Sequence, residues 1–189
     1  MSIRSSTKPY KVYKFVHNTD ECIITSIVDK YYKSENGFIE LTQDGKIFIN
    51  GSRLNGYAWD GCTPKFEFLD FVIGTPDGRL DYLTEKPITY YASLVHDAIY
   101  QYKSEIPVCR KDADIIFLKI LSEAGFYWSW VYYIIIRLFG GFYGKWKAKS
   151  NTKNLRLLES SWIKRVVSLS VAKEVEKHAF MQVAVKYKK

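Results

Sequence analysis

The side chains best suited to chemistry lie close together in the sequence, between Ala92 and Phe117. The segment ASLVHDAIYQ contains His96, Asp97 and Tyr100 among residues that favour a helix. Tyr100 follows His96 by four residues, so the two side chains point from the same face of the predicted helix. A base, an acid and a phenol are therefore expected at one place.

A second predicted helix supplies another carboxylate to this place. It begins in RKDADIIF, after a short connection through Pro107, and Asp114 borders its apolar face. That face is formed by residues at helical spacing: Ala113, Ile116, Phe117, Ile120, Leu121 and Ala124. Two helices joined by a short loop tend to pack as an antiparallel pair, so we expect His96 and Asp114 to come within reach of each other.

Two catalytic interpretations of an adjacent His-Asp pair have little support in this sequence. A metal-dependent phosphohydrolase of the HD type needs a further upstream histidine, and the only one is His17, which lies in a predicted turn. A serine or cysteine hydrolase needs a nucleophile placed against the histidine, and no GxSxG-type sequence is present.

A third interpretation is a water-activating dyad that works with calcium. His96 would be the general base, Asp114 would orient its imidazole, and Asp97 would bind the ion. The loop GYAWDG could add oxygen ligands from Asp60 and Gly61, although the sequence alone favours a hydrogen bond from Asp60 to its own backbone. The alternative, which composition alone favours, is a buried polar network that ties two helices together and includes the Tyr100 phenol.

The elements that would position these residues differ along the chain. Residues 1–9 are expected to form an arm, and the runs VYKFV and CIITSIV form strands separated by a turn at His17–Asp20. The sequence FIELTQDGKIFIN predicts a hairpin that turns at Asp44-Gly45. GYAWDG is expected to be a loop. The first third of the chain is therefore predicted to be rich in β-structure.

Helices are expected in the rest of the chain. A buried third helix in WSWVYYIIIRLFGG should end at Gly140-Gly141, and its apolar run is too short to cross a bilayer. Beyond Asn151 one or two amphipathic helices are expected. Their shared face would contain Leu155, Leu158, Trp162, Val166 and Leu169.

The positive charge of the chain is concentrated in this tail. Residues 145–189 contain twelve Lys or Arg and three Glu, a net charge of +9, whereas residues 1–144 have a net charge of −1. Such a tail suits an anionic partner, which could be nucleic acid, anionic lipid or an acidic protein face, or it is simply a solvated helix surface. Three cysteines without ligand spacing argue against a disulfide framework or a zinc site, and they favour a reducing compartment.

Four motifs occur in an order that resembles an uncharacterised family of tailed-bacteriophage and prophage proteins. They are GYAWDGCTP, ASLVHDAIYQ, RKDADIIF and VYYIIIRLFGG, matching WDGxTP, VHDxxY, ADxxF and VRxFGG-type patterns across about residues 37–144. The resemblance implies a phage virion protein that is made in the host cytoplasm. The basic tail lies beyond the family pattern.

The VHDxxY and ADxxF segments are also similar to the helix pair of secreted phospholipases that cleave the sn-2 ester. In those enzymes the histidine is the base, the aspartate beside it binds calcium and the later aspartate orients the histidine. By position, these roles would fall on His96, Asp97 and Asp114. The glycine-rich calcium loop of those enzymes has only a partial counterpart here, in residues 57–61, and their cysteines are missing.

Taken together, the sequence predicts one α+β domain in residues 1–144 and a basic helical extension in residues 145–189. The domain should combine a β-rich N-terminal portion with a three-helix core around the His-Asp helix hairpin. The leading functional hypothesis is a virion-associated structural protein of the tail or connector, with other phage structural proteins as partners. The alternative is a calcium-dependent phospholipase-like hydrolase that acts on the host envelope.

Overall fold

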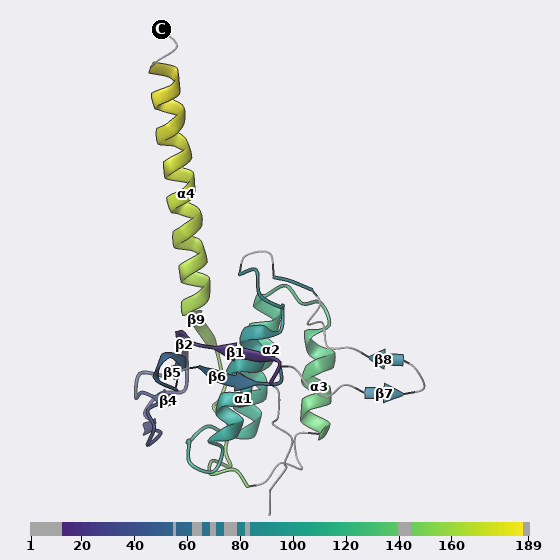
Figure 1. Ribbon diagram of the computed structural model, residues 1–189. Helices are drawn as coiled ribbons and strands as arrows, with labels where there is room; N and C mark the ends of the chain where they lie inside the picture. Colours follow the sequence, from purple (N-terminus) through teal and green to yellow (C-terminus); the bar gives the residue numbers. More distant parts are fainter. Residues whose placement is uncertain are drawn as a thin grey trace, which may run out of the picture.

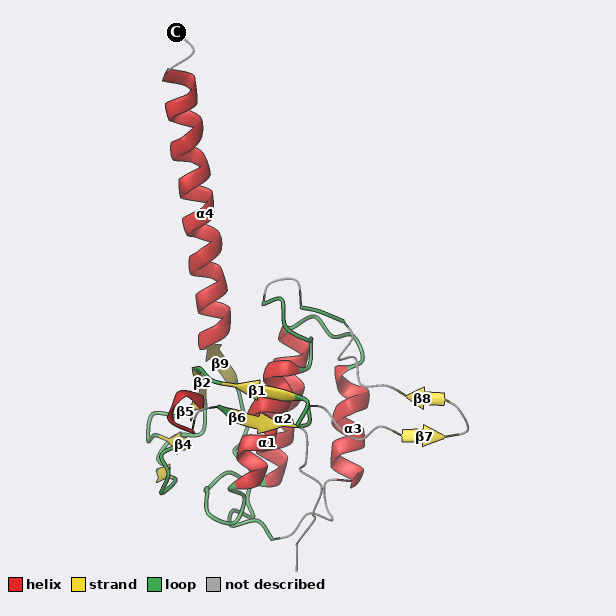
Figure 2. Cartoon of the chain, in the orientation of Figure 1, coloured by secondary structure: helices red, strands yellow, loops and turns green. Residues whose placement is uncertain are grey.

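The protein has an α+β fold, as the sequence predicts (Figures 1 and 2). Strands occupy the N-terminal half, and helices follow them apart from one late strand. The computed structural model describes residues 13–54, 56–61, 66–68, 71–73, 79–81, 84–139 and 145–186. The expected arm at residues 1–9 and the expected helix cap at Gly140-Gly141 lie outside this set.

Nine strands and five helices are found among the described residues. The strands are β1 (Phe15–His17), β2 (Asp20–Thr25), β3 (Tyr32–Lys33), β4 (Ile39–Leu41), β5 (Lys46–Asn50), β6 (Tyr57–Trp59), β7 (Phe66–Phe68), β8 (Phe71–Ile73) and β9 (Leu157–Ser160). The helices are the short η1 (Gly51–Leu54) and the longer α1 (Tyr90–Gln101), α2 (Arg110–Glu123), α3 (Ser129–Phe139) and α4 (Ser161–Lys186).

A five-stranded sheet with the order β3-β4-β5-β2-β9 forms the main β-structure. Its β4–β5 hairpin turns at Asp44-Gly45, as predicted, and Ile39 lies opposite Ile49 across it. Gly45 has a φ of 81°, and a Cβ atom there would lie 2.3 Å from the carbonyl oxygen of Thr25. Because both conditions exclude a side chain, the turn requires glycine.

The first two strands form as predicted but have separate partners. β1 pairs with β6, whereas β2 pairs with β5 and β9. The prediction that GYAWDG is a loop is therefore wrong for Tyr57–Trp59, which form β6. Trp59 packs against Phe15 of β1, with ring centroids 5.4 Å apart, and its indole nitrogen donates to Ser93 of α1. Packing on both sides stabilises a strand where the flanking glycines indicated a turn.

The sheet and the helices enclose a common hydrophobic core. Sheet residues such as Ile23 and Ile47 belong to the same buried cluster as Leu94 of α1 and Phe117 of α2. Helix α1 lies beside α2, and α2 contacts α3 (Figure 1). The three predicted helices are therefore present.

Helix α3 is only partly buried, which corrects the expectation of a buried third helix. Trp130, Ile134 and Leu138 are exposed, and their spacing of four residues places them on one side of the helix. Their positions on the outer side of α3 leave the opposite side to pack against α2. We call these three residues the α3 ridge.

The chain beyond residue 145 returns to the sheet before it leaves the domain. Leu157–Ser160 form β9 beside β2 and Leu155 precedes that strand, so the prediction that Leu155 and Leu158 lie on a helix face is wrong. Helix α4 begins at Ser161 and extends away from the rest of the protein (Figure 1). Trp162 near its start is buried, whereas residues 167–174 are exposed. Among the described residues, no helix combines the length and the apolar character that a membrane span requires.

Candidate functional site

The structure brings His96 and Asp114 into direct contact. The Nε2 atom of His96 lies 3.0 Å from Oδ1 of Asp114, and the Tyr100 hydroxyl donates to the same oxygen at 2.7 Å. Asp114 has no exposed surface, and His96 is 9% exposed. The helix pair therefore forms the predicted cluster of base, acid and phenol. Because the carboxylate only accepts hydrogen bonds, Nε2 of His96 carries the proton in this contact.

Two arginines complete the surroundings of Asp114. Arg137 of α3 donates from Nη1 to Oδ2 at 2.9 Å, and Nε of Arg110 lies 3.7 Å from the same oxygen. Another nitrogen of Arg110 donates to the main-chain oxygens of Ile136 and Arg137 near the end of α3. Asp114 thus joins α1, α2 and α3 through charged hydrogen bonds, which are stronger than neutral ones.

Neither arginine was among the residues predicted from the sequence to form the site. Arg137 could have been found, because it is the only charged residue in the apolar helix VYYIIIRLF and such a charge needs a partner. Arg110 precedes Asp114 by four residues on α2, a spacing at which opposite charges attract each other. Both residues also lie within the motifs RKDADIIF and RLFGG.

The electrostatics of the site favour the charged forms of its acid and base. Burial raises the pKa of Asp114, but hydrogen bonds from His96, Arg137 and Tyr100 outweigh it, and the pKa lies below its ordinary value. Burial lowers the pKa of His96, but the carboxylates of Asp114 and Asp97 raise it above its ordinary value. Burial and the Asp114 charge raise the pKa of Tyr100, so the phenol remains a hydrogen-bond donor.

Asp97 lies on the opposite side of the imidazole. Its Oδ1 is 3.8 Å from Nδ1 of His96, and its side chain is 38% exposed. At this distance the two groups can form an ion pair, but they are too far apart for a direct hydrogen bond. Asp97 is therefore the member of the cluster that solvent reaches most readily, which is the position expected for the calcium ligand of the hydrolase hypothesis.

The structure does not gather the proposed calcium ligands into one cluster. Within the described part of the chain, no three His, Cys, Asp or Glu residues are arranged to hold a metal ion. Asp60 and Gly61 directly follow β6, and Gly61 has a φ of 76°. Calcium also binds main-chain oxygens, so Asp97, Asp60 and Gly61 remain a predicted ligand set that depends on the hydrolase hypothesis.

The second histidine of interest, His17, has a structural environment. Its expected position in a solvated turn is wrong, because it is buried at the end of β1. Its Nδ1 lies 3.1 Å from the Tyr90 hydroxyl and its Nε2 lies 3.1 Å from Oγ1 of Thr19. Burial is the main reason that its pKa is lowered. Both ring nitrogens are thus occupied by hydroxyl groups rather than directed toward His96.

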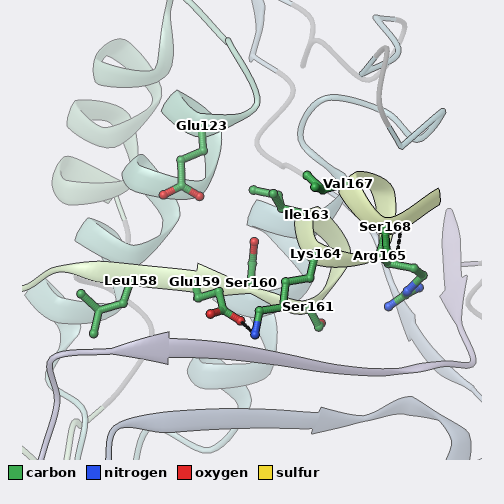
Figure 3. A pocket seen from close by; sticks show the side chains of 10 residues that line it. All are labelled: Glu123, Leu158, Glu159, Ser160, Ser161, Ile163, Lys164, Arg165, Val167 and Ser168. Atoms are coloured by element: carbon green, nitrogen blue, oxygen red, sulfur yellow. Dashed lines mark hydrogen bonds and ion pairs between the residues drawn. The ribbon is translucent and has the colours of Figure 1, made fainter. Parts of the chain in front are cut away.

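A separate hollow of about 800 Å³ lies where β9 meets α4. Figure 3 shows Glu123 of α2 on one side of it and the side chains of β9 and early α4 on the other. Leu158 and Val167 are exposed there, and Lys164 pairs with Glu159. The combination of exposed apolar groups and paired charges suits a protein contact better than a catalytic site.

Comparisons with models of known families, with curated proteins and with solved structures found no match. The resemblance to the phage family and to the phospholipase helix pair therefore stays a prediction from the motifs.

Proposed function

We propose that this protein is a structural component of a phage virion, at the tail or the connector, and that its His-Asp network is a structural tie. The observation that supports this most is the enclosure of Asp114. Both of its oxygens accept hydrogen bonds from side chains, and the donors come from α1 and α3. Such a network holds three helices in one arrangement.

The position of His96 also supports a structural role. Its ring packs against Phe117 and Tyr100, with ring centroids 5.1 Å and 4.1 Å away. A general base needs contact with water or substrate through its free nitrogen. Here Nδ1 faces Asp97, and only a small part of the histidine reaches solvent.

Partner binding is assigned to the exposed apolar surface. The α3 ridge, formed by Trp130, Ile134 and Leu138, presents large side chains of the kind that dominate interface energies. Its proposed partner is another phage structural protein.

Residues 145–189 add positive charge that would suit anionic lipid or nucleic acid. The virion assignment itself comes from the motif resemblance, which also implies synthesis in the host cytoplasm.

The alternative is a calcium-dependent phospholipase-like hydrolase of the host envelope. The contact between His96 and Asp114, the hydrogen bond from Tyr100 and the exposed position of Asp97 favour it. In that case His96 would take a proton from water while Asp97, with Asp60 and Gly61, held the calcium ion. This function would require the site to open further around Nδ1.

Incorporation into particles tests the leading proposal. We expect Trp130→Ser combined with Leu138→Ser to reduce the amount of this protein in purified virions at least about tenfold, because each lost side chain contributes about 1.5–3 kcal/mol when buried. Quantitative mass spectrometry of virions from the encoding phage would measure this. Val28→Ser with Leu80→Ser is the control, since both side chains are exposed elsewhere on the surface. Absence of the wild-type protein from virions would overturn the proposal.

A further inference from the structure

We infer that a basic pocket at the N-terminal end of α2 binds a nucleotide unit of single-stranded nucleic acid. The pocket has a volume of about 680 Å³, within the range of small-ligand sites. Its lining brings together five cationic side chains and one indole: Arg110, Lys111, Arg137, Lys145, Lys149 and Trp146. This inference does not depend on the virion assignment.

Contacts between distant segments build the pocket. Cys109, at the start of α2, forms a β-bridge with Ala148. Asp112 accepts hydrogen bonds from the backbone nitrogen and the hydroxyl of Thr152. These contacts hold the segment around residues 145–152 against the first turn of α2. Two lysines of that segment thereby face the same hollow as the helix terminus, whose dipole is positive at this end.

Asp114 offsets part of the charge of Arg110 and Arg137, but among the described residues no carboxylate pairs with the lysines of the pocket. Of the residues that the structure describes, no Asp or Glu lines the pocket. Asp112 is engaged by Thr152, and Asp114 is enclosed behind Arg137. Between described residues, no ion pair involves Lys111, Lys145 or Lys149. These lysines are exposed, so they are available for phosphate groups.

The two arginines have a different role from the lysines. Arg110 and Arg137 are fixed by their bonds to the end of α3 and to Asp114. Because these two arginines share the single carboxylate of Asp114, a net positive charge remains at the inner wall, whereas the lysines can move to contact a ligand. An anion that enters the pocket meets fixed charge at its base and mobile charge at its rim.

Trp146 identifies the ligand as more than a phosphate ion. Its ring makes a perpendicular contact with Tyr100 at 4.7 Å between centroids, and its partly exposed side chain lines the pocket. A base can stack on an aromatic ring while lysines bind the adjacent phosphates, the combination used by single-strand binding proteins. Trp146 is half-buried within a hollow, so it is poorly placed to insert into a lipid bilayer. These features favour nucleic acid over an anionic membrane.

Fluorescence anisotropy of a labelled oligothymidylate with the full-length protein tests the inference. We expect Lys145→Gln with Lys149→Gln to weaken binding about tenfold and to reduce the slope of log affinity against log salt by about 1.4, because each phosphate contact contributes about 0.7. The matched control is Lys147→Gln with Lys153→Gln. It removes the same charge from the same segment, but neither side chain lines the pocket. The control should bind within about twofold of wild type, as expected for surface changes outside the contact.

Three results would overturn the inference. The first is no binding of the oligonucleotide by the wild-type protein. The second is an equal loss in both double variants, which would indicate diffuse charge attraction. The third is binding to vesicles of an anionic phospholipid that is lost in Lys145→Gln with Lys149→Gln while oligonucleotide binding is unchanged in that variant. Inorganic phosphate should compete only weakly, since it cannot stack on Trp146. Circular dichroism would confirm that every variant is folded.

Discussion

Replacing Asp114 with asparagine is expected to lower the free energy of unfolding by about 3–5 kcal/mol, the usual effect of removing one partner from a buried ion pair. The variant would leave Arg137 and His96 without their negative partner in a site that has no exposed surface at residue 114. Urea unfolding would measure the loss. In thermal unfolding it corresponds to a decrease in Tm of about 10 °C.

The free energy of unfolding that Asp114→Asn loses should depend on pH, because both Asp114 and His96 titrate. The pKa of Asp114 is lowered from 3.8, so its stabilisation is present above that value and is lost as the pH falls through the folded-state pKa. The pKa of His96 is raised from 6.5, so its contribution is present below that value and declines as the pH rises through the folded-state pKa. The difference between wild type and Asp114→Asn should therefore be largest between about pH 4 and 6.5.

Asp97→Asn is the control for this experiment. The side chain of Asp97 is partly exposed and makes no direct hydrogen bond to His96 at 3.8 Å, so its loss should cost less than about 1 kcal/mol. The lowered pKa of His17 makes the free energy of unfolding rise with pH, opposite to the effect of His96. This contribution is the same in wild type, Asp114→Asn and Asp97→Asn, so it cancels when their stabilities are compared. Equal stability of Asp114→Asn and Asp97→Asn would contradict a structural network centred on Asp114.

Replacing Trp162 with alanine should have a comparable effect, about 3–5 kcal/mol, because it removes a large buried side chain. Trp162 is 4% exposed and stacks on Tyr91 of α1, with centroids 4.4 Å apart and an interplanar angle of 7°. One turn later, Arg165 pairs with the buried Glu21 of β2. Together these contacts attach the start of α4 to the domain.

Denaturant unfolding would measure the effect of Trp162→Ala, and Leu169→Ala would be its control. Leu169 lies on the same helix but is exposed, so its replacement should change the free energy of unfolding by less than about 0.5 kcal/mol. A loss below about 1 kcal/mol for Trp162→Ala would mean that the start of α4 is not anchored as described, because buried tryptophans cost several times more.

The parts of the fold that the sequence predicts well depend on local patterns. The helix pair follows from apolar residues at helical spacing, and the β4–β5 hairpin follows from Asp44-Gly45 between alternating runs. The contact between His96 and Asp114 could be predicted because the two helices are joined by a short loop. These features need little information from distant residues.

The parts that were wrong depend on distant partners. Leu158 has helical spacing with Trp162, but Leu157–Ser160 pair with β2 more than 130 positions earlier and form β9. His17 is buried because β1 pairs with β6 and because the Tyr90 hydroxyl reaches its ring from α1. Non-local pairing overrides local pattern in both cases, and a single sequence contains no direct signal of it.

Fatty-acid release from phospholipid vesicles in excess calcium would distinguish a structural His96 from a catalytic one. Wild type and His96→Gln would be compared, with Asp97→Asn as a second variant in case His96→Gln is poorly folded. The structural account predicts the protein-free rate for all three. Calcium-dependent release by wild type that is lost in a folded His96→Gln or Asp97→Asn protein would contradict it and establish the hydrolase alternative.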